Sequence, residues 1–111
     1  VEVLRNDAGA QVLRRARTTA AAFWKAGTMH DITVDRAACL IFHKDRGGVK
    51  MSVSDPTHAS DEVVITIRGI GAKRPVGPDA DRVSCERVRN AVRLRVDTSG
   101  TVGSTIAFSL R

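Results

Sequence analysis

Hydrophobic and polar residues alternate along the chain from about Ile32 onward, a pattern typical of strands with one buried and one exposed face. The segment KDRGG at 44–48 interrupts the alternation with two glycines and predicts the turn of a β-hairpin. The alternating apolar positions, which we expect to point inward, are Ala38, Leu40, Phe42, Val49, Met51, Val53, Val63, Ile65, Ile67, Val92, Leu94, Val96, Ile106, Phe108 and Leu110.

The remaining segments complete the predicted fold. Residues 1–4 (VEVL) and 10–16 (AQVLRRA) predict a strand pair, and 18–27 (TTAAAFWKAG) predicts an irregular or briefly helical stretch that carries Phe23 and Trp24 inward. The segment 68–81 (RGIGAKRPVGPDAD) contains three glycines and two prolines and predicts a loop. Many short strands joined by turns indicate an all-β fold, an antiparallel two-sheet β-sandwich.

The length of the chain sets its organisation. One domain over 1–111 is large enough to bury a core without disulfides or metals. The sequence has no apolar run of the about 20 residues that a membrane helix requires, and no signal-peptide pattern. It opens with VEVLRND and no methionine, which indicates a fragment of a longer protein with any export signal upstream. We expect a monomer with no membrane partner.

The charge of the chain favours polyanionic partners. The formal net charge is +6 and the isoelectric point is near 10.4. Nucleic-acid modules usually add aromatic stacking platforms, whereas this chain has three Phe, one Trp and no Tyr, and its arginines are scattered. Three alternatives therefore remain: an acidic polysaccharide partner, a nucleic-acid partner, and a basic surface with no partner. Nucleic acid is less favoured than acidic polysaccharide.

Ser54, Asp55 and His58 supply the three groups of a hydrolytic triad, but within five residues of sequence. Triad members normally converge from distant parts of a chain. Pro56 forces Asp55 to be extended, and the Asp55 carboxylate can accept a hydrogen bond from the Thr57 amide. We therefore interpret Ser54, Asp55, Pro56 and Thr57 as a structural corner rather than a catalytic site.

Neither a metal nor a cofactor is expected from the sequence. His30 and His43 are not spaced as ligands on one element, and His43 is expected to be a solvated edge residue. Asp79 and Asp81 are two loop carboxylates without a third ligand, which is weak evidence for calcium.

Cys39 and Cys85 lie in separate predicted strands and in no CxxC or histidine-rich cluster, which argues against zinc. Two buried thiols are favoured, and a single disulfide in an exported protein remains the alternative.

Trp24 is the one candidate aromatic platform for a sugar, with Arg17 and Lys25 as polar neighbours in sequence. Its neighbour Phe23 and the preceding alanines favour burial against the sheet instead.

Four segments resemble the C-terminal domain of the family 8 polysaccharide lyases, which include hyaluronate, chondroitin AC and xanthan lyases. They are VEVLRNDAGAQVLR at 1–14, TAAAFWKAGT at 19–28, DRAACLIFHKDRGGVKMSVSDPT at 35–57 and EVVITI at 62–67. The most specific features are Asn6 with Gln11, the pair Phe23 and Trp24, and VSDPT at 53–57. The resemblance weakens through the later loop and the last two strands.

The resemblance implies that the parent protein cleaves its polymer by β-elimination, with Asn, His, Tyr and Arg on an N-terminal α/α toroid. None of those catalytic motifs maps onto this chain. The mechanism needs an acid or base with the pKa of tyrosine, and the chain contains no Tyr, so we expect it to be inactive alone.

The function implied is that of a non-catalytic C-terminal domain of a secreted bacterial lyase. It would pack against the preceding domains of the same enzyme and assist the attraction of acidic polysaccharide, for which the candidate residues are Trp24, Arg14, Arg15, Arg17, Arg93 and Arg95. The alternative is a stand-alone carbohydrate-binding module that uses Trp24 and the arginines, with a nucleic-acid-binding domain as a less favoured third reading.

Overall fold

The structure is a computed structural model that describes residues 2–5, 11–15, 18–22, 27–29, 31–36, 38–45, 48–54, 61–70, 74–100 and 105–111. For the strands before Gly27, the backbone is described and the side chains are not. Within these residues, no helix has the length and apolar character needed to cross a membrane.

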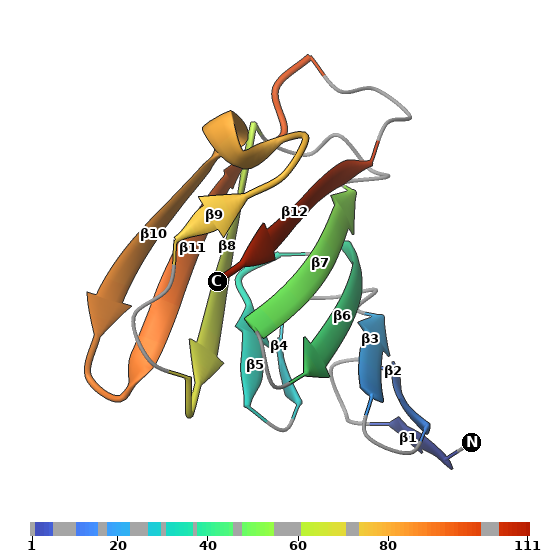
Figure 1. The fold of residues 1–111 in the computed structure, drawn as a ribbon. Helices are drawn as coiled ribbons and strands as arrows, with labels where there is room; N and C mark the ends of the chain where they lie inside the picture. The colour runs from blue at the N-terminus through green and yellow to red at the C-terminus, as the bar shows by residue number, and fades with distance from the viewer. Residues whose placement is uncertain are drawn as a thin grey trace.

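Two antiparallel sheets face each other and form a sandwich (Figure 1). The five-stranded sheet has the order β10-β11-β8-β5-β4, with β4 at Gly27–Met29, β5 at Ile32–Val34, β8 at Glu62–Arg68, β10 at Val83–Val88 and β11 at Ala91–Asp97. The four-stranded sheet has the order β6-β7-β12-β9, with β6 at Cys39–Asp45, β7 at Gly48–Ser54, β9 at Pro75–Val76 and β12 at Ile106–Leu110. The predicted antiparallel β-sandwich is confirmed.

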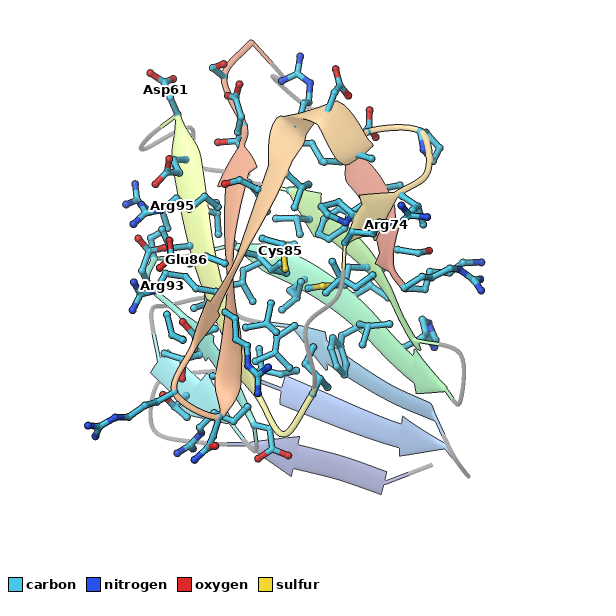
Figure 2. The ribbon with its side chains drawn as sticks, turned by 60° about the vertical axis from the view of Figure 1, so that its left-hand side comes forward. Asp61, Arg74, Cys85, Glu86, Arg93 and Arg95 are labelled. Carbon is cyan, nitrogen blue, oxygen red and sulfur yellow. The ribbon has the colours of Figure 1, made fainter. Side chains whose placement is uncertain are left out.

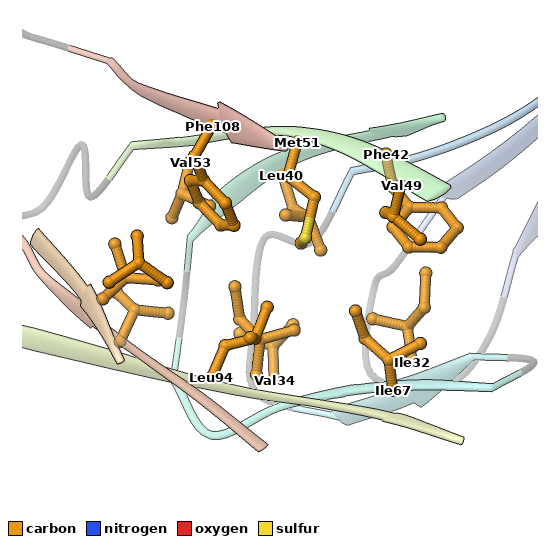
Figure 3. Packing of buried hydrophobic residues seen from close by; sticks show 14 of the residues in the cluster. Ile32, Val34, Leu40, Phe42, Val49, Met51, Val53, Ile67, Leu94 and Phe108 are labelled. Atoms are coloured by element: carbon orange, nitrogen blue, oxygen red, sulfur yellow. The ribbon is translucent and has the colours of Figure 1, made fainter. Parts of the chain in front are cut away.

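The core lies between these two sheets, as Figure 3 shows. Every inward position expected from the alternation is buried, from Ala38, which directly precedes β6, to Leu110 on β12. Ile32, Val34 and Val83 complete the buried set, and Ile70 and Cys85 pack against it. Because apolar burial is the main favourable term in folding, this shared layer is what holds the two sheets together.

A third sheet at the N-terminus has the order β1-β2-β3, with β1 at Glu2–Arg5, β2 at Gln11–Arg15 and β3 at Thr18–Ala22. The pairing of β1 with β2 confirms the predicted strand pair. The expected irregular or helical stretch is wrong for Thr18–Ala22, because these residues pair with β2 along their whole length and lie beside β6. Tertiary pairing outweighs the helix propensity of its alanines. Phe23 and Trp24 lie outside the described residues.

The predicted loop at 68–81 is partly wrong, because it contains β9 and the start of a short 3₁₀ helix, η1, at Ala80–Arg82. Pro75 and Val76 pair with Leu110 and Ser109 at the edge of the four-stranded sheet. A proline cannot donate to a ladder, so an edge strand is the place in a sheet where it fits.

Gly48 is the last residue of the predicted hairpin turn and begins β7, and the pairing of β6 with β7 confirms that hairpin. Its φ is +149°, and a Cβ atom at this position would overlap the carbonyl oxygen of Leu110 on β12. Only glycine therefore fits where the hairpin passes against the end of the last strand.

Candidate functional site

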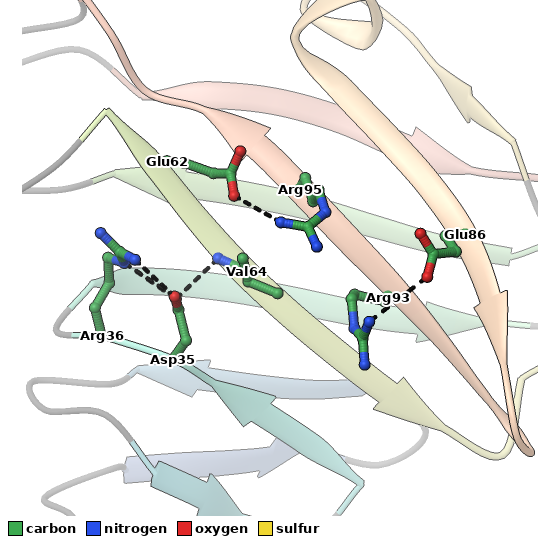
Figure 4. Close-up of polar contacts among 7 residues, drawn as sticks. All are labelled: Asp35, Arg36, Glu62, Val64, Glu86, Arg93 and Arg95. Atoms are coloured by element: carbon green, nitrogen blue, oxygen red, sulfur yellow. Dashed lines mark hydrogen bonds and ion pairs between the residues drawn. The ribbon is translucent and has the colours of Figure 1, made fainter.

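The outer face of the five-stranded sheet carries two of the arginines predicted to attract a glycan. Arg93 and Arg95 alternate with buried residues along β11 and point away from the core. Arg93 pairs with Glu86 at 3.5 Å, and Arg95 pairs with Glu62 at 3.0 Å (Figure 4). All four side chains are between 39% and 57% exposed, so each arginine stands at the surface beside a carboxylate of opposite charge.

The outer face of the four-stranded sheet has a different composition. The side chains at its centre are small and half-buried, namely Cys39, Ser52, Ser54, Ala107 and Ser109. Ile41, at 52% exposed, is the large hydrophobic residue that protrudes from it.

Positive side chains gather at one end of that same face. Lys50 on β7 is opposite Ser109 on β12, and Arg111 continues β12 two residues further on the same face. The main-chain groups of Arg74 and Arg111 exchange two hydrogen bonds of 3.2 and 3.1 Å. Lys50, Arg74 and Arg111 are all exposed, and we refer to them as the basic cluster.

Asp35 connects β5 to β8 through both its main chain and its side chain. Its N–H donates to the carbonyl of Val64 at 3.1 Å, and its carboxylate accepts the Val64 N–H at 2.9 Å. Arg36 also donates to this carboxylate, at 2.8 Å (Figure 4). Burial raises the pKa of Asp35, but the hydrogen bonds from Arg36 and Val64 outweigh it, so the pKa lies below its usual value.

Asp79 makes the same connection in the four-stranded sheet. Its N–H donates to the Ala107 carbonyl at 3.2 Å, and its carboxylate accepts the Ala107 N–H at 2.8 Å. Asp79 is therefore a structural residue that ties the chain before η1 to β12. Asp81 is exposed, and the described residues contain no group of three potential metal ligands.

The turn after β11 is held by Asp97 and Arg82. The Asp97 carboxylate accepts hydrogen bonds from the hydroxyl and the N–H of Ser99, which lower the pKa of Asp97. Arg82 donates to the carbonyl of Ser99 at 3.0 Å and, at 3.4 Å, to that of Asp97. Arg82 therefore serves the fold, because one nitrogen of its guanidinium group donates to two main-chain carbonyls of this turn.

Residues 2–64 match the polysaccharide lyase family 8, C-terminal beta-sandwich domain. The chain belongs to this family. It is 31% identical to hyaluronate lyase HylB of Cutibacterium acnes over 117 residues, an alignment that covers 97% of this chain and 14% of the relative. It is 27% identical to hyaluronate lyase HylA of the same organism, with the same coverage.

A solved structure supports the same family assignment for this chain. The X-ray structure of the Streptomyces coelicolor A3 chondroitin AC lyase in complex with chondroitin sulphate matches with a TM-score of 0.74 and 28% identity. The match covers 98% of this chain and 15% of that one. The chain thus spans only a small part of the length of the relatives it resembles.

The structure describes only Ser54 of the predicted corner. Ser54 is the last residue of β7, is half-buried and is opposite Cys39. Asp55, Pro56, Thr57 and His58 lie outside the described residues, so the preference for a corner over a catalytic site stays a prediction.

The side chains of four of the predicted glycan residues are not described. Arg14 and Arg15 lie in β2, opposite Thr19 and Thr18, and their side chains are not described. Arg17 and Trp24 lie outside the described residues. Their role in glycan attraction stays a prediction, as it does for Arg93 and Arg95.

The histidines and cysteines do not form a metal-ligand cluster in the described part of the chain. His43 is exposed on β6, as expected, and is opposite Lys50, while His30 lies outside the described residues. Cys39 and Cys85 are both thiols, but they are half-buried rather than buried. Cys39 lies on the outer face of one sheet and Cys85 packs against the core from the other (Figure 2), so a disulfide between them does not fit this arrangement.

Proposed function

We propose that this chain is the non-catalytic C-terminal domain of a secreted bacterial lyase that degrades acidic polysaccharides by β-elimination. The relatives named as hyaluronate lyases and the solved chondroitin AC lyase support this substrate class. The net charge of +6 also favours attraction of a polyanion over long range.

The non-catalytic role rests on one observation: several charged side chains form hydrogen bonds to the main chain. The carboxylates of Asp35, Asp79 and Asp97 each accept a main-chain N–H, and Arg82 donates to main-chain carbonyls. Groups committed in this way hold strands and turns in place. A β-elimination site instead requires a base and an acid that are available to the sugar, and tyrosine is absent from the sequence.

The domain in this proposal stabilises the parent enzyme and packs against its preceding domains. A sandwich with a continuous apolar core is a rigid body, which suits a scaffold better than a moving catalytic part. The long-range attraction of acidic polysaccharide by the net positive charge of the chain belongs to this proposal.

The proposal is tested by incubating the 111-residue chain with hyaluronan and with chondroitin sulfate and following the ultraviolet absorbance of unsaturated uronic acid. A chondroitin AC lyase serves as the positive control. We expect no product from the chain. Product that forms in proportion to the concentration of the chain would overturn the non-catalytic role.

A further inference from the structure

The basic cluster draws its members from three neighbouring strands and not from one run of sequence. Lys50 lies on β7, Arg111 directly follows β12, and Arg74 directly precedes β9. Directly opposite residues on antiparallel strands have Cβ atoms about 5 Å apart, and diagonal ones about 7 Å. Arg111 is therefore beside Arg74 and diagonal to Lys50, through the pairing of Lys50 with Ser109.

The alternation of the strands places all three side chains on one surface. Val49, Met51 and Leu110 are buried, and Lys50 and Arg111 lie between or after them and are exposed. His43, opposite Lys50, adds a further exposed nitrogen donor to the row. Figure 2 shows Arg74 on the opposite side of the molecule from Arg93, Arg95 and Glu86.

The ion pairs among the described residues lie elsewhere in the molecule. The ion pairs of the described chain join Arg36 to Asp35, Arg93 to Glu86 and Arg95 to Glu62, and they do not involve Lys50, Arg74 or Arg111. Like charges placed directly opposite one another on neighbouring strands destabilise a sheet. Arg74 opposite Arg111 therefore costs stability unless an anion binds there.

The sequence around the hairpin of β6 and β7 contains further charged residues. Lys44 and Asp45 are the last residues of β6, and Arg46 follows them in the sequence, so this segment contains two cations and one anion. Their side chains are not described, so the basic cluster is limited to Lys50, Arg74 and Arg111.

We propose that Lys50, Arg74 and Arg111 form a binding surface for a linear acidic polysaccharide, separate from the arginine pairs on the five-stranded sheet. This inference rests on the proposed function, which supplies the class of polymer. Carboxylates or sulfates that recur along a chain match a row of cations from adjacent strands, and Arg can bind each of them with two parallel hydrogen bonds. The hydroxyls of Ser52 and Ser109 lie on the same face and can bond to sugar hydroxyls.

The surface favours a polysaccharide over a single-stranded nucleic acid. Single-stranded nucleic acids are bound by aromatic side chains on which bases stack. Phe42 and Phe108 are both buried, and Ile41 is the large hydrophobic residue exposed on this face of the described chain. A duplex needs only phosphate contacts, so it is included as a probe in the test.

The test compares two sets of substitutions in the 111-residue chain by titration with hyaluronan oligosaccharides at low salt. The first set is Lys50→Ala, Arg74→Ala and Arg111→Ala together. The matched control is Arg93→Ala with Arg95→Ala, which removes arginines that already have carboxylate partners. We expect the first set to weaken binding by about tenfold or more and the control to change it by less than about threefold.

Thermal unfolding separates a binding role from a structural one. Because the cluster places like charges together, its neutralisation is expected to leave the unfolding temperature unchanged or to raise it. A fall in unfolding temperature together with unchanged affinity would assign the cluster to the fold and overturn the inference. If the triple variant were poorly folded, Lys50→Glu alone is expected to weaken binding in the same direction, and unchanged affinity would overturn the inference.

The remaining outcomes distinguish this inference from the proposed function. Equal losses in both sets of variants would overturn the separate surface and leave the non-catalytic role intact. The choice of polysaccharide would be overturned if the wild-type chain bound a DNA duplex as tightly as hyaluronan and the same variants lost that binding. Product formation by the isolated chain would overturn the proposed function whichever variants bind.

Discussion

The two outer faces of this sandwich use similar residues in opposite ways. On the five-stranded sheet, Arg93 and Arg95 stand beside Glu86 and Glu62. On the four-stranded sheet, the cations of the basic cluster stand beside one another and face small, half-buried neighbours. A net charge of +6 therefore does not indicate where an anion binds, because cross-strand pairing decides which positive charges are already compensated.

The interior connections of the two sheets are, in contrast, alike. Asp35 and Asp79 each donate a main-chain N–H to a strand residue and accept that residue's N–H with their carboxylate. Each aspartate thus reproduces both hydrogen bonds of an antiparallel pair with one residue. Because a side chain supplies the acceptor, the pairing with β8 or β12 continues past the end of β5 or β9, where the chain turns away.

Gly48→Ala is expected to break the four-stranded sheet with the largest effect. The added methyl group would collide with the main-chain carbonyl of Leu110, so either β7 or β12 must shift. The alanine would also have to adopt a φ of +149°, which L-residues avoid. We expect a loss of about 3 kcal/mol or more in the free energy of unfolding, measured by urea denaturation.

Gly100→Ala is the matched control for this substitution. Its φ is +69°, but nothing lies within 4 Å of a Cβ atom there, so the expected cost is about 1 kcal/mol from the backbone conformation alone. Equal losses at the two positions would contradict the close contact between Gly48 and β12.

Asp79→Ala is expected to have an intermediate effect on the same sheet. It removes the acceptor of the partly buried Ala107 N–H, which costs about 1–3 kcal/mol in the free energy of unfolding. Asp79→Asn keeps an acceptor oxygen and should restore most of the loss. If Asn were as damaging as Ala, the charge of Asp79 rather than its hydrogen bond would be the stabilising feature.

Asp35→Asn, in the five-stranded sheet, is expected to change the free energy of unfolding least, and in a pH-dependent way. The pKa of Asp35 is lowered in the folded state, so its charge stabilises the fold above its usual pKa near 3.8, and this contribution is lost as the pH falls through the folded value. Asp35→Asn should cost less than about 1 kcal/mol at pH 7, because the Asp35 side chain is 34% exposed.

The measurement is chemical denaturation of the wild type and Asp35→Asn at several pH values. The difference between them should shrink as the solution is acidified toward about pH 2. A difference that grows on acidification would show that the folded carboxyl group binds its proton more tightly than the unfolded one.

Local patterns in the sequence predict the buried faces well, because the period of two is a property of each strand alone. They identify Val63, Ile65 and Ile67 as core residues without any knowledge of the partner strand. They do not identify β3 as a strand, because its alanines and threonines become a strand only through β2 and β6.

The charged contacts depend on strand order, which no local pattern contains. Glu62 and Arg95 are 33 residues apart in sequence, and Asp35 and Val64 are 29 apart. The basic cluster forms only because β12 lies between β7 and β9. Arg93 and Arg95 stand out in the sequence because their strand alternates cleanly, whereas Lys50, Arg74 and Arg111 come together only through the register of β7, β12 and β9.

The measurement that tests the contrast between the two faces most directly is a backbone amide NMR titration of the 111-residue chain with a hyaluronan oligosaccharide. The chemical-shift changes are predicted to gather around Lys50, Arg74, Ser109 and Arg111 on the four-stranded sheet. Changes centred on Arg93 and Arg95 would contradict the account, because the polymer would then bind the arginines that already have carboxylate partners.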